Sequence, residues 1–177
     1  MKQRVMRWLI RIGLGIGSLG VVLFAALWLT TYHPDEVQQE PVTCVPNAPK
    51  LKKGQTLKVL SWNVQYMAGK GYVFFYDLPH DAGPDERPSA EAITQTFGEV
   101  RRIILEERPD ILLLQELDDG AARTDDEDQL ARLIELLGKD LTFACQTSAW
   151  YWKASFVPHP RIMGSVGMKL ATLSKFH

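Results

Sequence analysis

The chain has 177 residues, a formal net charge of −1 and only two cysteines. This length corresponds to one ordinary domain with an appended segment. The near-neutral charge argues against a protein that coats nucleic acid generally, because such proteins are strongly basic. It does not exclude a nuclease, whose site can be locally cationic or can hold a metal.

An uncharged apolar run occupies residues 12–30. A helix needs about 20 residues to cross a bilayer, and this run has a similar length. Basic residues precede the run and acidic residues follow it, so the positive-inside rule predicts a cytoplasmic N-terminus and an outer or periplasmic position for the rest. A cleaved signal peptide, which would give a secreted protein, is the alternative. Bulky residues at Leu27, Trp28 and Leu29 leave no clear cleavage site, which favours an uncleaved anchor.

The composition divides the chain into three parts. Residues 1–31 are the basic start and the transmembrane anchor, residues 32–55 are a proline-rich linker, and residues 56–177 are the globular part. Cys44 lies in the linker and Cys145 in the globular part. In an oxidising compartment they can form a disulfide that ties the two together. Two unpaired thiols are the alternative, because the sequence does not give the Cα separation that decides between them.

The first elements of the globular part are a strand, a long loop and a helix. We expect a strand at residues 57–64 and an irregular, aromatic-rich stretch at residues 67–88, which is either a binding loop or an insertion packed by its aromatic rings. Ser89 is an N-cap residue for a helix that runs to about residue 108. Apolar residues at helical spacing along this segment predict the face that packs on the core.

A second strand is predicted at residues 111–115, where four successive aliphatic residues indicate that both faces are covered. A second helix begins at Asp126 or Asp128 and ends near Gly138. Three further strands are predicted at the end of the chain, at residues 141–146, 149–157 and 168–175. The order strand, helix, strand, helix, strands predicts a layered α/β fold.

Two polar residues follow apolar strands, at the positions where α/β enzymes collect their ligands. Asn63 ends the first strand, and Glu116 comes directly after the second. Magnesium often takes only one or two protein carboxylates, with water and substrate phosphate completing its shell. An amide can donate to a phosphate oxygen. The alternatives are a solvated glutamate and an asparagine that bonds only to nearby backbone.

An acidic loop follows Glu116. It has two interpretations, a second contact for a metal or a solvated entry to the next helix, and the second is favoured because acidic residues suit helix N-termini. Its members are Asp118, Asp119, Asp125, Asp126, Glu127 and Asp128.

Three segments together resemble one family. They are Leu-Ser-Trp-Asn-Val at residues 60–64, Arg-Pro-Asp-Ile-Leu-Leu-Leu-Gln-Glu at residues 108–116, and a glycine-rich strand ending in Leu-Ser-Lys-Phe at residues 163–176. This combination resembles the endonuclease/exonuclease/phosphatase superfamily, the deoxyribonuclease-I-like group. The resemblance implies a two-sheet α/β sandwich, of which this chain supplies the N-terminal half.

The resemblance also implies roles for individual residues. Asn63 would position the phosphate and a metal-bound water, and Glu116 would be the ligand of Mg²⁺, with Mn²⁺ as an alternative cofactor. Gln115 would be a packing residue or a support for the ligands. The family's later Gly-Asp-x-Asn and Ser-Asp-His motifs are absent, and none of the four histidines stands in such a context. We therefore expect a truncated chain that is inactive or nearly so as given, with the activity belonging to a longer form.

The function implied by the resemblance is a membrane-anchored, externally facing, magnesium-dependent phosphodiesterase or other phosphoester hydrolase. Its substrate, a lipid or a nucleic acid, is not determined by these residues, and nothing indicates a specific protein partner. The alternative is a non-catalytic, membrane-anchored binding module that retains the strand motifs for packing.

Overall fold

The computed structural model describes residues 2–159 and 161–177, which form two compact units. The first unit ends at His33 and consists mainly of helix α1 (Lys2–Thr30). This helix is long and apolar enough to cross a membrane, although a signal sequence near an N-terminus passes the same test. The anchor predicted from the sequence is thus weakly supported, and its orientation stays a prediction.

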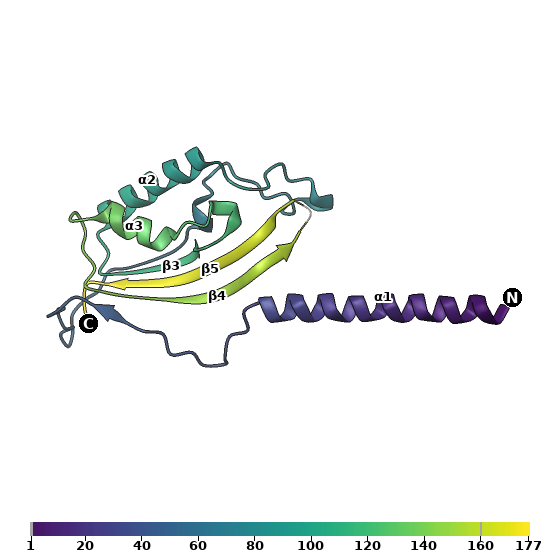
Figure 1. Cartoon of the computed structure of the whole chain (residues 1–177). Helices are drawn as coiled ribbons and strands as arrows, with labels where there is room; N and C mark the ends of the chain where they lie inside the picture. The colour runs from purple at the N-terminus through teal and green to yellow at the C-terminus, as the bar shows by residue number, and fades with distance from the viewer. Residues whose placement is uncertain (1, 160) are drawn as a thin grey trace. The chain divides into compact units, whose positions relative to one another are not determined.

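The second unit, Pro34–His177, is built on one five-stranded sheet with the order β1-β4-β5-β3-β2 (Figure 1). Its strands are β1 (Thr43–Cys44), β2 (Val59–Asn63), β3 (Ile111–Asp118), β4 (Cys145–Pro158) and β5 (Met163–Ser174). β2 and β3 are parallel, and the other neighbours are antiparallel. The predicted mixed α/β fold is confirmed.

Helices α2 (Ala90–Glu107) and α3 (Gln129–Leu137) lie on one face of the sheet (Figure 1). The Ser89 hydroxyl accepts a hydrogen bond from the backbone N–H of Ala92, as expected of an N-cap. Asp128 caps α3 in the same way through Ala131. Three short 3-10 helices, at Gln65–Met67, Pro79–Asp81 and Ala122–Thr124, complete the helical structure that is described.

The core lies between the helices and the sheet. Leu112, Leu114 and Leu117 of β3 are fully buried there, together with apolar residues of α2 and α3. Ile111 and Leu113 point to the other face and are only half-buried. The expectation that both faces of this strand are covered is therefore met on one face only among the described residues.

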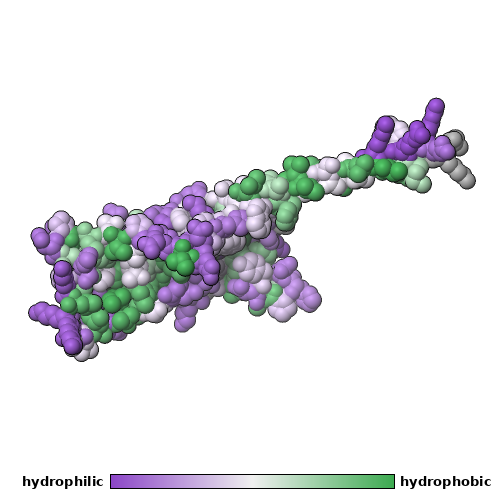
Figure 2. All heavy atoms as spheres, turned by 90° about the horizontal axis from the view of Figure 1, so that it is seen from below, coloured by the Kyte–Doolittle hydropathy of each residue, from purple (hydrophilic) through white to green (hydrophobic). Residues whose placement is uncertain are grey.

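The face of the sheet away from the helices carries exposed apolar side chains. Val59 is 52% exposed and Leu170 is 42% exposed. Figure 2, which looks from below the view of Figure 1, shows hydrophobic side chains lying beside hydrophilic ones on this side.

The C-terminal strands are longer than predicted. The strand predicted at residues 141–146 is wrong for residues 141–144, which form no strand. Its last two residues and the segment 149–157 belong to the single strand β4, and β5 begins at Met163 rather than at residue 168. The two strands form one antiparallel hairpin whose register shifts between Trp150 and Trp152 and again between Ala154 and Val157. Neither shift lies at the predicted break, because Thr147 and Ser148 pair regularly with Thr172 and Ala171. The polar residues at 146–148 interrupt the apolar pattern there without ending the strand.

The two cysteines form a disulfide, which decides between the two alternatives that the sequence left open. Cys44 of β1 and Cys145 of β4 are register partners, and their Cα atoms lie 4.1 Å apart. The disulfide joins β1, the edge strand formed by the segment after residue 34, to the neighbouring strand β4. Strand β1 itself was not predicted, because only two residues form it.

Candidate functional site

The two predicted site residues lie at the same edge of the sheet. Asn63 ends β2 and is the register partner of Gln115 in the parallel strand β3, so Glu116 follows one position later. The backbone N–H of Val64 donates to the carbonyl of Gln115 over 3.1 Å and ties the two strand ends together. An amide and a carboxylate thus stand where the parallel pairing of β2 and β3 ends. Glu116 was predicted to follow the strand directly but lies inside β3, which continues to Asp118.

Glu116 sits in a β-bulge. Leu114 pairs with Ala171 and Leu117 with Lys169, so β3 has one more residue than β5 between these pairs. Glu116 has a φ of 58°, in the left-handed region that non-glycine residues rarely adopt. Without the bulge, alternation would place position 116 on the core face after Leu112 and Leu114. The bulge instead keeps Leu117 in the core and leaves Glu116 half-buried.

The Glu116 carboxylate accepts no hydrogen bond and forms no ion pair with any residue in the described part of the chain. Its negative charge is felt by Tyr151 of β4, whose pKa is raised first by burial and then by Glu116. The Tyr151 hydroxyl lies 3.3 Å from the sulfur of Met168. Glu116 is therefore a carboxylate free to take a ligand.

The side chain of Asn63 is exposed and only partly used. Its Oδ1 accepts from the backbone N–H of Gln65 over 2.9 Å, which leaves the amide group of Asn63 as a donor. The Gln115 amide lies 3.4 Å from the Ser61 hydroxyl and from the Leu113 carbonyl, so Gln115 makes local contacts on its own sheet.

The acidic loop after Glu116 is in part the solvated helix entry that the sequence favoured, because Asp125, Asp126 and Asp128 are exposed and Asp128 caps α3. Asp118 departs from that interpretation. Asp118 is fully buried and makes two hydrogen bonds with the guanidinium of Arg123, of 2.8 and 2.9 Å. Burial raises the pKa of Asp118 against these bonds. Burial also opposes the charge of Arg123, but the bonds and the charge of Asp118 outweigh it, so the pKa of Arg123 is raised.

The other acidic residues of this loop also have partners. Asp119 pairs with Lys169, Asp125 with Arg87 at 2.7 Å, and Asp126 accepts from Ser165 at 3.1 Å. Within residues 2–159 and 161–177, no group of three histidine, cysteine, aspartate or glutamate side chains is placed to hold a metal ion. The site therefore offers one carboxylate and one amide, which suits Mg²⁺ that keeps most of its shell as water and phosphate.

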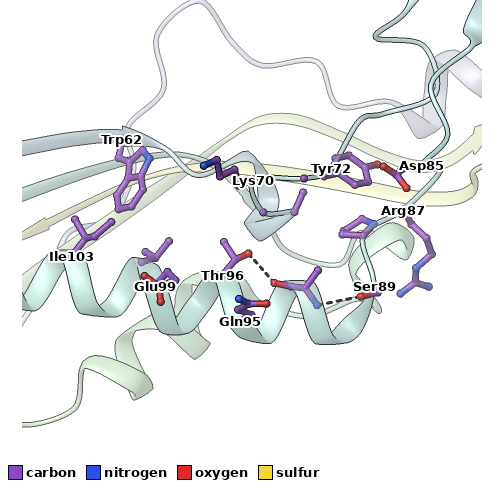
Figure 3. A pocket seen from close by; sticks show the side chains of 16 residues that line it. Trp62, Lys70, Tyr72, Asp85, Arg87, Ser89, Gln95, Thr96, Glu99 and Ile103 are labelled. Atoms are coloured by element: carbon purple, nitrogen blue, oxygen red, sulfur yellow. Dashed lines mark hydrogen bonds between the residues drawn. The ribbon is translucent and has the colours of Figure 1, made fainter.

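A concave region lies elsewhere. A cavity of about 690 Å³ runs along α2 and is walled by the segment from Ala68 to Tyr72 (Figure 3). Trp62 and Ile103 lie toward one end of it, and Tyr72 and Arg87 toward the other (Figure 3). Part of the long aromatic loop thus forms the wall of a cavity, but neither Asn63 nor Glu116 lines it.

Comparison with known proteins gives one match. A family model for the endonuclease/exonuclease/phosphatase family matches residues 60–177, which begin in β2 and include both strand ends. No curated protein and no solved structure matches the chain. The matched segment contains β3, β4, β5 and all of β2 but its first residue, both helices that cover the sheet, and the pair formed by Asn63 and Glu116. The chain therefore belongs to the endonuclease/exonuclease/phosphatase family, a family of the phosphoester-hydrolase type.

Proposed function

We propose that the chain supplies the Glu116 part of a magnesium-dependent phosphoester hydrolase site, and that these residues alone, which lack the family's later motifs, are inactive or nearly so. The observation that carries this proposal is the β-bulge, which removes an unpaired carboxylate from the core face and leaves it beside Asn63. A bulge next to an active site commonly serves to re-aim a side chain in this way. A carboxylate needed only for solubility would not require a left-handed backbone.

Glu116 and Asn63 would have different roles at the site. Glu116 would hold the cation, and the free donor of Asn63 would bind and orient a phosphate oxygen. Mg²⁺, or Mn²⁺ in its place, supplies stabilisation of the charge that develops on the phosphoryl group. The hydrogen bond from Val64 to Gln115 fixes the two ends against each other, so the phosphate and the cation would meet at one place. The family's Gly-Asp-x-Asn and Ser-Asp-His motifs do not occur in these 177 residues.

The membrane position is part of the proposal. Arg4, Arg7 and Arg11 precede the apolar part of α1, and the acidic residues after it include Asp35 and Glu36. This asymmetry supports an N-terminus in the cytoplasm and a catalytic unit on the outer or periplasmic side. Substrates there would be phosphoesters of lipids or of nucleic acids outside the cytoplasm. Cleavage of α1 as a signal would instead give a secreted protein with the same site.

Calorimetric titration of the full chain in detergent micelles with Mg²⁺ tests the metal site. We expect saturable binding, and we expect Glu116→Gln to weaken it about tenfold or more, because even outer-shell changes cost metal sites this much. The matched control is Glu135→Gln, which removes the same charge from an exposed position of α3. Equal affinity for both variants would contradict the proposal. Absence of Mg²⁺ binding in a folded sample would favour the non-catalytic binding module.

A further inference from the structure

The buried polar side chains of the molecule form one network. Among the described residues, only Asp118, Arg123, Thr124 and Gln129 are buried and polar or charged, and each is at most 8% exposed. All four lie in the segment that follows Glu116. The core is otherwise apolar, so this concentration of polar groups is specific to one end of the sheet.

Asp118 is the centre of the network. Its carboxylate accepts two hydrogen bonds from Arg123 and one of 3.1 Å from the Thr124 hydroxyl. Its backbone N–H donates to the side-chain oxygen of Gln129 over 3.0 Å. The groups satisfy one another, which is the condition for placing them in an apolar interior.

The network also reaches the segment that follows β2. The side-chain amide of Gln129 donates to the carbonyl of Tyr66 over 2.8 Å, and the guanidinium of Arg123 lies 3.5 Å from the centre of the Tyr66 ring. Tyr66 comes three residues after Asn63, and Asp118 comes two residues after Glu116. Gln129 therefore connects the chain just beyond one site residue to the chain just beyond the other.

Both connected segments have an unusual backbone. Gln65, Tyr66 and Met67 have φ values of 46°, 41° and 58°, and Glu116 has a φ of 58°. Non-glycine residues hold such conformations only where the surrounding structure enforces them. The network supplies contacts of this kind both to the segment that follows β2 and to the end of β3.

Stability alone does not explain the network. A buried ion pair is often no better for stability than apolar residues of the same volume, because both charges lose their water. Hydrogen bonds do, however, fix direction and distance, which apolar packing does less strictly. The network's position between the two strand ends then indicates what is being fixed.

We propose that the network formed by Asp118, Arg123, Thr124 and Gln129 is a positioning device that sets the placement of Glu116 relative to Asn63. Gln129 is the positioning residue that joins the two strand ends, and Arg123 holds the carboxylate of Asp118 and covers Tyr66. The inference rests on the proposed function for its purpose. The geometric part, a link between the strand ends, is independent of any metal.

Gln129→Met tests the proposal, because it keeps the volume of the side chain and removes both of its hydrogen bonds. The first measurement is hydrogen exchange of the Val64 amide, which bridges the strand ends, relative to amides in the middle of β3. The second is Mg²⁺ affinity by calorimetry. We expect the relative exchange rate of the Val64 amide to rise about tenfold, which corresponds to the loss of one hydrogen bond. We expect the Mg²⁺ affinity to fall several-fold.

Leu133→Ala is the matched control. Leu133 lies on α3 with Gln129, is fully buried and makes only apolar contacts with the core. Its truncation lowers global stability at least as much, but we expect it to leave the relative exchange of Val64 and the Mg²⁺ affinity of the folded protein unchanged. If Gln129→Met does not fold, Arg123→Lys takes its place, since lysine keeps the charge and loses the two-bond geometry.

The outcomes separate the two proposals. Unchanged relative exchange of Val64 in the network variant overturns the positioning role. Faster exchange with an unaltered Mg²⁺ affinity also overturns it and leaves a purely structural network. If the unmodified protein binds no Mg²⁺, the proposed function fails, while the exchange ratio still decides whether the network joins the strand ends.

Discussion

The two ends of the parallel pair β2–β3 differ in how their polar groups are used. At the amino end, the carboxylate of Asp110 accepts from the backbone N–H of Lys58 over 3.0 Å and from the ammonium of Lys175 over 3.2 Å. The disulfide at Cys145 closes the same end of β4. At the carboxyl end, the Glu116 carboxylate has no partner in the described part of the chain. The carboxylate at the amino end is fully bonded, whereas at the carboxyl end Glu116 stays unpaired beside a buried polar network whose own groups are satisfied.

This difference shows how a structural carboxylate can be told from a candidate ligand. Asp110 and Glu116 belong to the same strand region, and either could be taken for a functional residue from the sequence. The Asp110 carboxylate accepts hydrogen bonds from a backbone N–H and from a lysine. Glu116, in contrast, is kept out of the core by a bulge and has no partner among the described residues. The partners, rather than the residue type, separate the two roles.

The largest effect is expected from removing the disulfide at the amino end. The bond closes a loop across a sequence separation of 101 residues. Cys44→Ala combined with Cys145→Ala should lower the free energy of unfolding by about 2–5 kcal/mol, as is typical for native disulfides. Denaturant titration measures the loss. Mg²⁺ affinity of the folded variant should stay unchanged, and a loss of affinity would mean that the two ends are coupled.

A smaller effect is expected from Asn63→Ala at the carboxyl end. The variant loses the hydrogen bond to the Gln65 amide, worth about 0.5–1.5 kcal/mol of stability. It also loses the donor proposed for phosphate, so the affinity for inorganic phosphate in the presence of Mg²⁺ should fall. The control is Asn63→Asp, which keeps the acceptor and removes the donor. Undiminished phosphate affinity in both variants would exclude Asn63 from the site.

The smallest effect is expected from Asp110→Asn, whose stability should differ from that of the wild type near neutral pH and approach it in acid. The hydrogen bond from the Lys58 amide, followed by the contact with Lys175, lowers the pKa of Asp110 below its ordinary value. A carboxyl with a lowered pKa contributes stability above its unfolded pKa of about 3.9 and loses it as the pH falls through the folded value.

Denaturant midpoints recorded across this acid range test the effect of Asp110. The wild-type chain should lose more stability than Asp110→Asn as the pH falls below about 4. Parallel pH profiles for the two proteins would show that the contacts of Asp110 contribute nothing.

Much of the fold follows from local sequence signals. Ser89 and Asp128 act as the N-caps that their positions suggested, and Asn63 ends β2 as its position after an apolar run suggested. The extent of β4 and β5 did not follow, because the polar residues at 146–148 and the glycines at 164 and 167 look like strand boundaries but lie inside the strands.

The site was predictable only in part. The positions of Asn63 and Glu116 at neighbouring strand ends could be inferred, but the left-handed backbone of Glu116 could not, because the side chain there is a poor match for that conformation. Nothing in the sequence indicated that Arg123 would be buried either. An acidic run before a helix predicts solvation, and only the folded chain shows that Asp118 and Arg123 are partners.

At position 116, the residue that best suits the backbone conformation differs from the residue proposed to bind a cation. A φ of 58° is one that glycine adopts without steric cost, so glycine is the residue that the bulge alone would select. The chain carries a glutamate there instead. An engineering effort that maximised thermal stability would replace this residue early and would erase the carboxylate with it. At position 116, thermal stability and the proposed capacity to bind a cation therefore favour different residues.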